Sequence, residues 1–88
     1  HALGFVNYVE PTPDAVRRRA YQLAARIRDN APLTVQAGKA SLLAAMSLGC
    51  DGGFARAKEI YRPVYASEDA QEGPRAFAEK RAPRWLGR

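Results

Sequence analysis

Residues 32–48 read PLTVQAGKASLLAAMSL and form the longest mostly apolar stretch of the chain. Their apolar side chains recur every three or four positions and cover most of the circumference, which predicts a helix buried on nearly all sides. Pro32 suits the first turn of this helix, because the residue before a proline avoids the α conformation. Polar residues such as Thr34 and Lys39 interrupt the run, so we do not expect a membrane-spanning segment of about 20 apolar residues.

A second helix precedes this stretch and is predicted over residues 13–29. Thr12 can cap it, Pro13 suits its first position, and Asp14 places a negative charge in its first turn. Apolar residues recur along it at helical spacing, while arginines lie mostly off that stripe (Val16, Ala20, Leu23, Ala24 and Ile27 against Arg17, Arg18, Arg26 and Arg28). One face of the helix should therefore be buried and the other basic.

The segment after residue 48 predicts a turn and further helices. Glycines at 49, 52 and 53 indicate the turn, and a third helix follows from Phe54, with Pro63 expected to kink it or end it near Arg62. Ser67 can cap a last helix that reaches Lys80 or Arg81, with Gly73 and Pro74 as a possible break. Residues 82–88 should be irregular.

The N-terminal residues have a different character. Val6 and Val9, flanked by aromatic residues, predict a short β-strand that ends at Pro11 and Pro13, because proline cannot continue strand pairing. The expected fold class is therefore all-α, with three to four helices after a short N-terminal strand. We divide the chain into residues 1–11, a strand and linker, and residues 12–88, a helical domain.

Composition limits the chemistry that the chain can perform. With 88 residues and 9.7 kDa it forms one domain at most, with marginal stability of its own. The only histidine, His1, is terminal, so no base is held beside a nucleophile. The single cysteine, Cys50, allows no intrachain disulfide or cysteine-based metal site and fits a reducing cytoplasm. We expect no catalytic residues and no metal.

The charge of the chain leaves its partner open. A net charge of +5 favours polyanions in general. Arg17, Arg18 and Arg19 could follow a nucleic-acid backbone, although a solvated helix face explains the same run. The acidic group of Glu68, Asp69 and Glu72 is explained by helix capping.

The C-terminal part of the chain carries a more specific pattern. Residues 65–81 read YASEDAQEGPRAFAEKR and are followed by Pro83, Trp85 and Gly87; GFVN stands at residues 4–7, and NAPL opens the stretch that leads to Lys39. In this order and spacing the chain resembles the C-terminal region of the enoyl-CoA hydratase/isomerase (crotonase) family. The resemblance covers essentially the whole chain, and its tail motif is the most specific part.

The resemblance implies a fold and a function. Family members consist of a spiral core and a helical C-terminal region that mediates trimer contacts, often within hexamers. In the hydratases, two glutamates and two backbone N–H groups of the core act on the thioester, and residues 1–11 would be only the end of that core, its last strand and a linker. The chain would thus belong to an enzyme that hydrates 2-enoyl-CoA in fatty acid β-oxidation type metabolism. Its substrate would be a coenzyme A thioester, with no tightly bound cofactor.

Two residues of this chain match family positions that contact coenzyme A. Lys80 aligns with a lysine that contacts a phosphate, and Tyr61 aligns with an aromatic residue near the adenine. An ammonium suits a phosphate, and an aromatic face suits a purine ring. The alternatives are that Lys80 is a solvated surface lysine and that Tyr61 is a core residue of the third helix. Pro63 and Pro74 depart from the common family pattern.

Three interpretations follow. The first is the C-terminal part of such an enzyme, a homo-oligomer that associates through this region and contributes to the coenzyme A site while being inactive alone. The second is a small basic helical module that binds nucleic acid through residues 17–19. The third is a truncated product without a role of its own.

Overall fold

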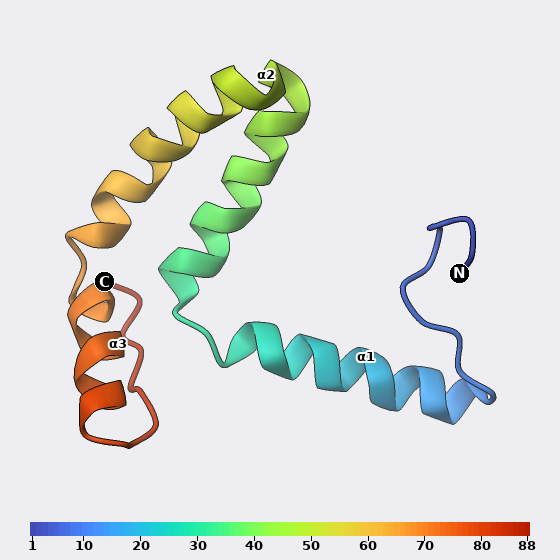
Figure 1. Cartoon of the computed structure of the whole chain (residues 1–88). Coiled ribbons are helices and arrows are strands. Elements are labelled where there is room, and N and C mark those ends of the chain that lie inside the picture. The colour runs from blue at the N-terminus through green and yellow to red at the C-terminus, as the bar shows by residue number, and fades with distance from the viewer.

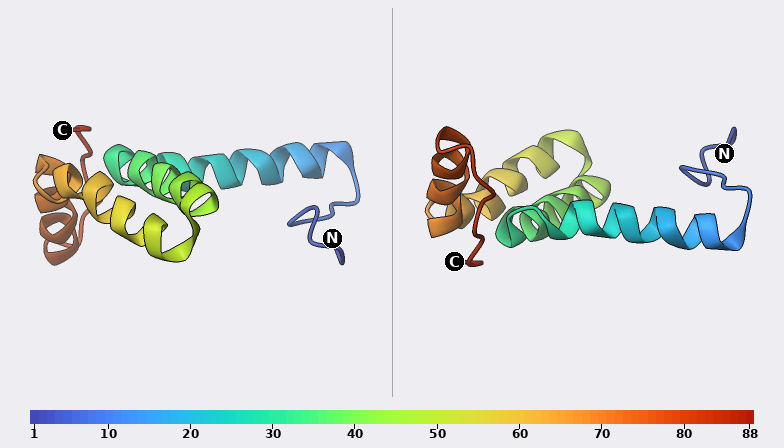
Figure 2. Two further views of the ribbon diagram at one scale, coloured as in Figure 1. Left: turned by 90° about the horizontal axis from the view of Figure 1, so that it is seen from above. Right: turned by 90° about the horizontal axis from the view of Figure 1, so that it is seen from below.

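The computed structural model describes residues 1–88 and contains three helices in chain order, α1 (Pro13–Arg28), α2 (Pro32–Tyr65) and α3 (Glu68–Ala78). Figure 1 shows α2 folded back on itself, with α3 beyond its second arm and α1 leading away from its first. From above and below, the N-terminal segment lies at the far end of α1, remote from α3 (Figure 2). The prediction of an all-helical chain is confirmed.

Both predicted helix caps are present. The Thr12 hydroxyl accepts the backbone N–H of Ala15 at 3.2 Å, and the Ser67 hydroxyl accepts that of Ala70 at 3.2 Å. Each hydroxyl satisfies one of the N–H groups that a helix start leaves unpaired. Asp29 caps the other end of α1, one residue after its last helical position.

The chain reversal in α2 is shorter than the predicted turn over residues 49–53. Only Gly49 leaves the helical conformation, with φ 70° and ψ −179°, a region open almost solely to glycine. The two arms then approach closely at Gly53, where a Cβ would lie 2.6 Å from the Cα of Ala45. Glycine at 53 thus permits the two arms to touch. Residues 50–53 belong to the helical second arm, and the predicted loop over these residues is not formed.

Two predicted interruptions are wrong. The second arm of α2 runs through Pro63 to Tyr65, because a proline in the last turn removes a single backbone hydrogen bond. Gly73 and Pro74 do not break α3, in which Pro74 is an interior residue. This helix ends at Ala78, before Lys80, whose φ of 53° is incompatible with a continuing right-handed helix.

The predicted N-terminal strand is not formed. Residues 1–12 adopt turns and bends, and Phe5 and Val9 remain 92% and 73% exposed. A strand requires hydrogen bonds to a neighbouring strand, and this chain supplies none. The boundary at residues 11 and 12 between linker and helical domain stays a prediction.

The chain buries little of itself. Only Ala37 and Ala76 form a buried apolar core, and the expected burial of α2 on nearly all sides is wrong, since Leu42 and Met46 are 69% and 84% exposed. The radius of gyration is 16.6 Å, against about 12 Å for a compact domain of this length. With so few helices, much of the apolar surface of α2 has no partner within the chain. No helix has the length and apolar character to cross a membrane.

Candidate functional site

An apolar groove lies between the two arms of α2 and holds one of the two predicted contact residues. Its volume is about 440 Å³, and small residues of the first arm face aromatic and small residues of the second (Gly38, Ser41, Leu42, Ala45, Cys50, Gly53, Phe54, Ala57 and Tyr61). The half-buried Tyr61 lies with its ring centroid 5.9 Å from that of Tyr65. Its hydroxyl is 3.4 Å from the place where Gly38 would carry a Cβ. Tyr61 therefore offers an aromatic surface at this groove.

Lys80, the other predicted residue, follows the end of α3 and is exposed. Its backbone N–H donates to the carbonyl of Phe77 at 3.2 Å, and the next N–H, of Arg81, donates to the carbonyl of Ala76 at 3.0 Å. These two bonds form a Schellman motif, which ends a helix with one left-handed residue. Lys80 does not line the groove that contains Tyr61, so the chain does not bring the two residues into one cavity.

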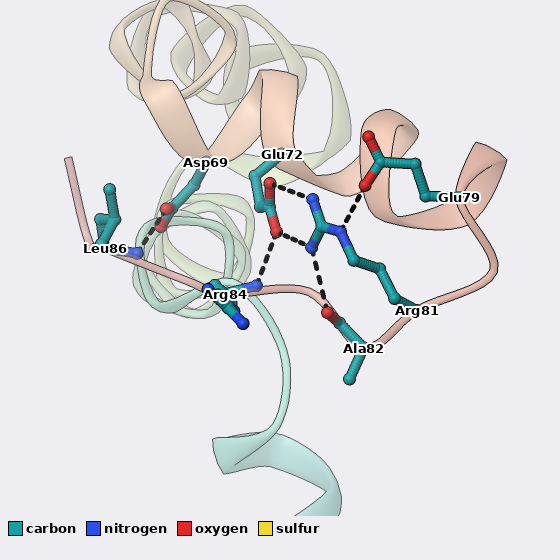
Figure 3. Close-up of polar contacts among 7 residues, drawn as sticks. All are labelled: Asp69, Glu72, Glu79, Arg81, Ala82, Arg84 and Leu86. Carbon is teal, nitrogen blue, oxygen red and sulfur yellow. Dashed lines mark hydrogen bonds and ion pairs between the residues drawn. The ribbon is translucent and has the colours of Figure 1, made fainter.

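Ion pairs surround Lys80 without including it. The Arg81 guanidinium donates to both carboxylate oxygens of Glu72, at 2.6 and 3.0 Å, and its Nε donates to Glu79 at 2.5 Å (Figure 3). The other ion pair of α3 joins Arg88 to Glu68 at 3.2 Å. The Lys80 ammonium is thus left without a carboxylate partner.

Glu72 is the centre of this cluster. It also accepts the backbone N–H of Arg84 at 2.7 Å, and its side chain is only 14% exposed. The hydrogen bonds from Arg81, and then the one from Arg84, lower the pKa of Glu72 to about 2. The same partnership raises the pKa of Arg81, so the pair remains ionised over the physiological range.

A second carboxylate fixes the C-terminal tail. One Asp69 oxygen accepts the backbone N–H of Leu86 at 2.7 Å (Figure 3). The other accepts the backbone N–H of Gly87 at 2.9 Å. Asp69 is 4% exposed, so these bonds satisfy a buried charge. Its place in the first turn of α3 agrees with the capping interpretation, but the contact with the tail was not predicted from the sequence. Neither were the contacts of Glu72 with Arg81 and Arg84, because no local spacing indicates them.

Three of the five arginines of α1 pair with carboxylates, whereas Arg18 and Arg26 do not. Arg17 pairs with Asp14, Arg19 with Glu10 at 2.8 Å, and Arg28 with Asp29 at 2.8 Å. The Arg19 guanidinium also lies 4.8 Å from the centre of the Tyr8 ring. These contacts agree with the interpretation of a solvated helix face, and the nucleic-acid interpretation stays a prediction.

The His, Cys, Asp and Glu side chains do not gather into a metal-binding cluster. No group of three or more His, Cys, Asp and Glu side chains is placed to hold a metal ion. Cys50 is a free, exposed thiol at the reversal of α2.

Comparison with known proteins identifies the family to which this helical chain is similar. The sequence model of the family described as enoyl-CoA hydratase/isomerase matches residues 1–88. The chain belongs to the enoyl-CoA hydratase/isomerase family. Among curated members of this family, enoyl-CoA hydratase EchA19 of Mycobacterium tuberculosis is 40% identical over 86 residues, which cover 98% of this chain and 32% of that protein. The 2,3-dehydroadipyl-CoA hydratase of Escherichia coli is 34% identical over 85 residues.

Solved structures of family members contain the same helical arrangement. The chain matches an enoyl-CoA hydratase of Mycobacterium tuberculosis with a TM-score of 0.89 and 41% identity, over 100% of this chain and 34% of that one. It matches an enoyl-CoA hydratase/isomerase of Mycobacterium paratuberculosis with a TM-score of 0.90 and 33% identity. The chain thus spans about a third of the length of these family members.

Proposed function

We propose that the chain is the C-terminal helical part of an enoyl-CoA hydratase-type enzyme, in which it provides subunit contacts and part of the coenzyme A site. The reaction would be the addition of water across the double bond of a 2-enoyl-CoA. One observation carries the proposal. The helices are arranged as in solved family members, yet much of their apolar surface has no partner within the chain.

The exposed area supports a role in association. The chain exposes 7465 Å², about 2,300 Å² more than a compact monomer of its mass would expose. A stable protein interface buries about 1,600 Å² in total. The exposed large apolar residues occur on all three helices, for example Tyr21, Leu42, Met46, Phe54 and Phe77. We therefore propose that the enzyme core and neighbouring subunits, in a trimer or hexamer, cover these faces.

Lys80 and Tyr61 are the proposed contacts with coenzyme A. The exposed ammonium of Lys80 has no carboxylate partner, which leaves it free to bind a phosphate group. The half-buried ring of Tyr61 borders an apolar groove and can pack against the adenine. Since these residues lie in different parts of the chain, the remaining surface of the site must come from the core or from another subunit.

Neither residue performs the hydration in this proposal. Two glutamates and two oxyanion-binding N–H groups of the core would act on the thioester, and the chain would be inactive alone. The substrate would be an acyl-CoA of fatty acid β-oxidation type metabolism, with no tightly bound cofactor. A cytoplasmic location fits the free thiol of Cys50.

The experiment begins with the DNA that precedes the codon for His1. We expect the reading frame to continue into a core with two suitably placed glutamates, and the complete product to hydrate crotonyl-CoA, measured by the loss of the unsaturated thioester absorbance. The 88-residue chain should show no such activity. A complete product that does not act on any acyl-CoA thioester would refute the proposal.

A further inference from the structure

Lys80 is the only residue other than glycine with a positive φ, at 53°. It occupies the position after the helix cap of α3 that is usually glycine, because a Cβ makes the left-handed conformation unfavourable. A glycine would keep both backbone hydrogen bonds of this helix end without that steric cost. Fold stability therefore does not explain a lysine here, and an unfavourable conformation that persists is often associated with function.

The surroundings of Lys80 hold this conformation from both sides. Its two sequence neighbours, Glu79 and Arg81, are joined by an ion pair at 2.5 Å. The Arg81 guanidinium is held by two hydrogen bonds to Glu72, which precedes it by nine residues and lies within α3. Because Glu72 also binds the tail at Arg84, the backbone on the C-terminal side of Lys80 is attached to α3 at two points. Figure 3 shows Glu72 and Glu79 on either side of the guanidinium.

In this arrangement Arg81 is paired with carboxylates, whereas Lys80 is not. Two carboxylates satisfy Arg81, which removes it as a competitor for an external anion. The Lys80 ammonium, next to this paired guanidinium, has no ion-pair partner, and neither has Arg75 in the last turn of α3. A flexible lysine stem normally samples many directions, and fixing its backbone limits the space that the ammonium samples. Such pre-organisation lowers the entropic cost of binding.

We propose that Glu72 and Arg81 are positioning residues that hold Lys80 in its left-handed conformation, so that its ammonium is presented to a phosphate group of coenzyme A. This inference rests on the proposed role of Lys80 in the enzyme. It adds that the ion pair, which does not touch the ligand, contributes to the recognition of the phosphate.

The test uses the complete enzyme and compares two substrates, a 2-enoyl thioester of coenzyme A and the same thioester of pantetheine, which lacks the phosphates of the nucleotide. Glu72→Gln should raise KM for the coenzyme A thioester roughly three- to tenfold, the size of the net contribution of one ordinary hydrogen bond. It should leave kcat and the KM for the pantetheine thioester unchanged. Glu68→Gln, which removes an exposed carboxylate from the same helix, is the matched control and should change neither constant.

Two lysine variants separate the conformation from the charge. Lys80→Ala removes the cation and keeps the unfavourable φ, whereas Lys80→Gly removes both. Both should raise KM for the coenzyme A thioester to a similar extent, while Lys80→Gly should have the higher melting temperature of the two. Because Glu72 acts through Lys80, the double variant Glu72→Gln with Lys80→Ala should be no worse than Lys80→Ala alone.

The outcomes distinguish the inference from the proposed function. If Lys80→Ala raises KM but Glu72→Gln does not, or if their effects add, Lys80 binds the phosphate and the positioning role is refuted. If Lys80→Ala leaves KM unchanged, contact with coenzyme A and positioning both fail. A crystal structure of the Glu72→Gln variant provides a readout independent of the substrate. A Lys80 φ that remains near 53° with the same ordered side chain would overturn the inference.

Discussion

The indole N–H of Trp85 donates to the backbone carbonyl of Asp29 at 2.9 Å, which joins residues 56 positions apart in the sequence. Asp29 is the cap that ends α1, so this bond attaches the C-terminal tail to the junction between α1 and α2. Gly87 lies near the start of α2, since a Cβ at this position would be 3.6 Å from the Cγ of Pro32. The tail itself is bound to α3 through Asp69 and Glu72. An irregular segment thereby links both ends of the helical arrangement.

The first prediction concerns this link. Trp85→Phe keeps an aromatic ring near Gly73 but removes the hydrogen bond to Asp29, and should cost about 1 kcal/mol of local stability. Amide hydrogen exchange should accelerate at residues 29–33 and in the tail, but not in the middle of α2. Trp85→Ala is the companion variant and should have a larger effect, because it also removes the ring. Unchanged exchange in Trp85→Phe would mean that the bond does not hold the junction.

The second prediction is the effect of acid on the tail. The folded-state pKa of Glu72, about 2, is below the ordinary 4.5 of a glutamate. A carboxylate with a lowered pKa contributes stability that is complete above its unfolded pKa and is lost as the pH falls toward the folded one. The tail should therefore remain bound at pH 4.5 and detach between about pH 4 and 2. Fluorescence of Trp85, the only tryptophan, reports the detachment.

Glu72→Gln is the control for the pH experiment. It removes the titrating group and should weaken the attachment of the tail at neutral pH, and the corresponding acid step should disappear. A wild-type fluorescence change centred at or above pH 4.5 would contradict the assigned contacts of Glu72, since such a midpoint belongs to a carboxylate without strong partners.

The third prediction uses two glycines as a matched pair. Gly53→Ala should push the arms of α2 apart, because its Cβ would lie 2.6 Å from the Cα of Ala45, and should cost about 1–3 kcal/mol. Gly73→Ala should stabilise α3 by about 0.5–1 kcal/mol, since the new Cβ would be in ordinary contact with Trp85, 3.5 Å away. Hydrogen exchange in α2 and α3 measures both effects. Equal effects of the two variants would contradict the close contact at Gly53.

Local chemistry predicted much of the helical fold. The starts of α1, α2 and α3 at Pro13, Pro32 and just after Ser67 are confirmed, since a cap or a first-turn proline acts within a few residues. Glycine 49 marked the reversal of α2 for the same reason. The family was also predicted correctly from the tail motif, and a family model matches the whole chain.

The errors arose where distant parts of the molecule decide the structure. A strand near Val6 needs a neighbouring strand, and the burial of α2 needs surfaces that the chain does not contain. The tail contacts of Asp69 and Glu72 span 9 to 18 residues without any regular period. The roles of Lys80 and Tyr61 remain predictions, because each depends on a ligand and on surfaces outside these residues.

The central claim is that the apolar faces of the three helices are completed by other parts of an enzyme. Sedimentation of the isolated 88-residue chain over a range of concentrations tests it most directly. We predict a mass that rises with concentration above 9.7 kDa, or an expanded monomer, because the chain cannot cover its own apolar surface. A single compact species of 9.7 kDa at every concentration would contradict the account.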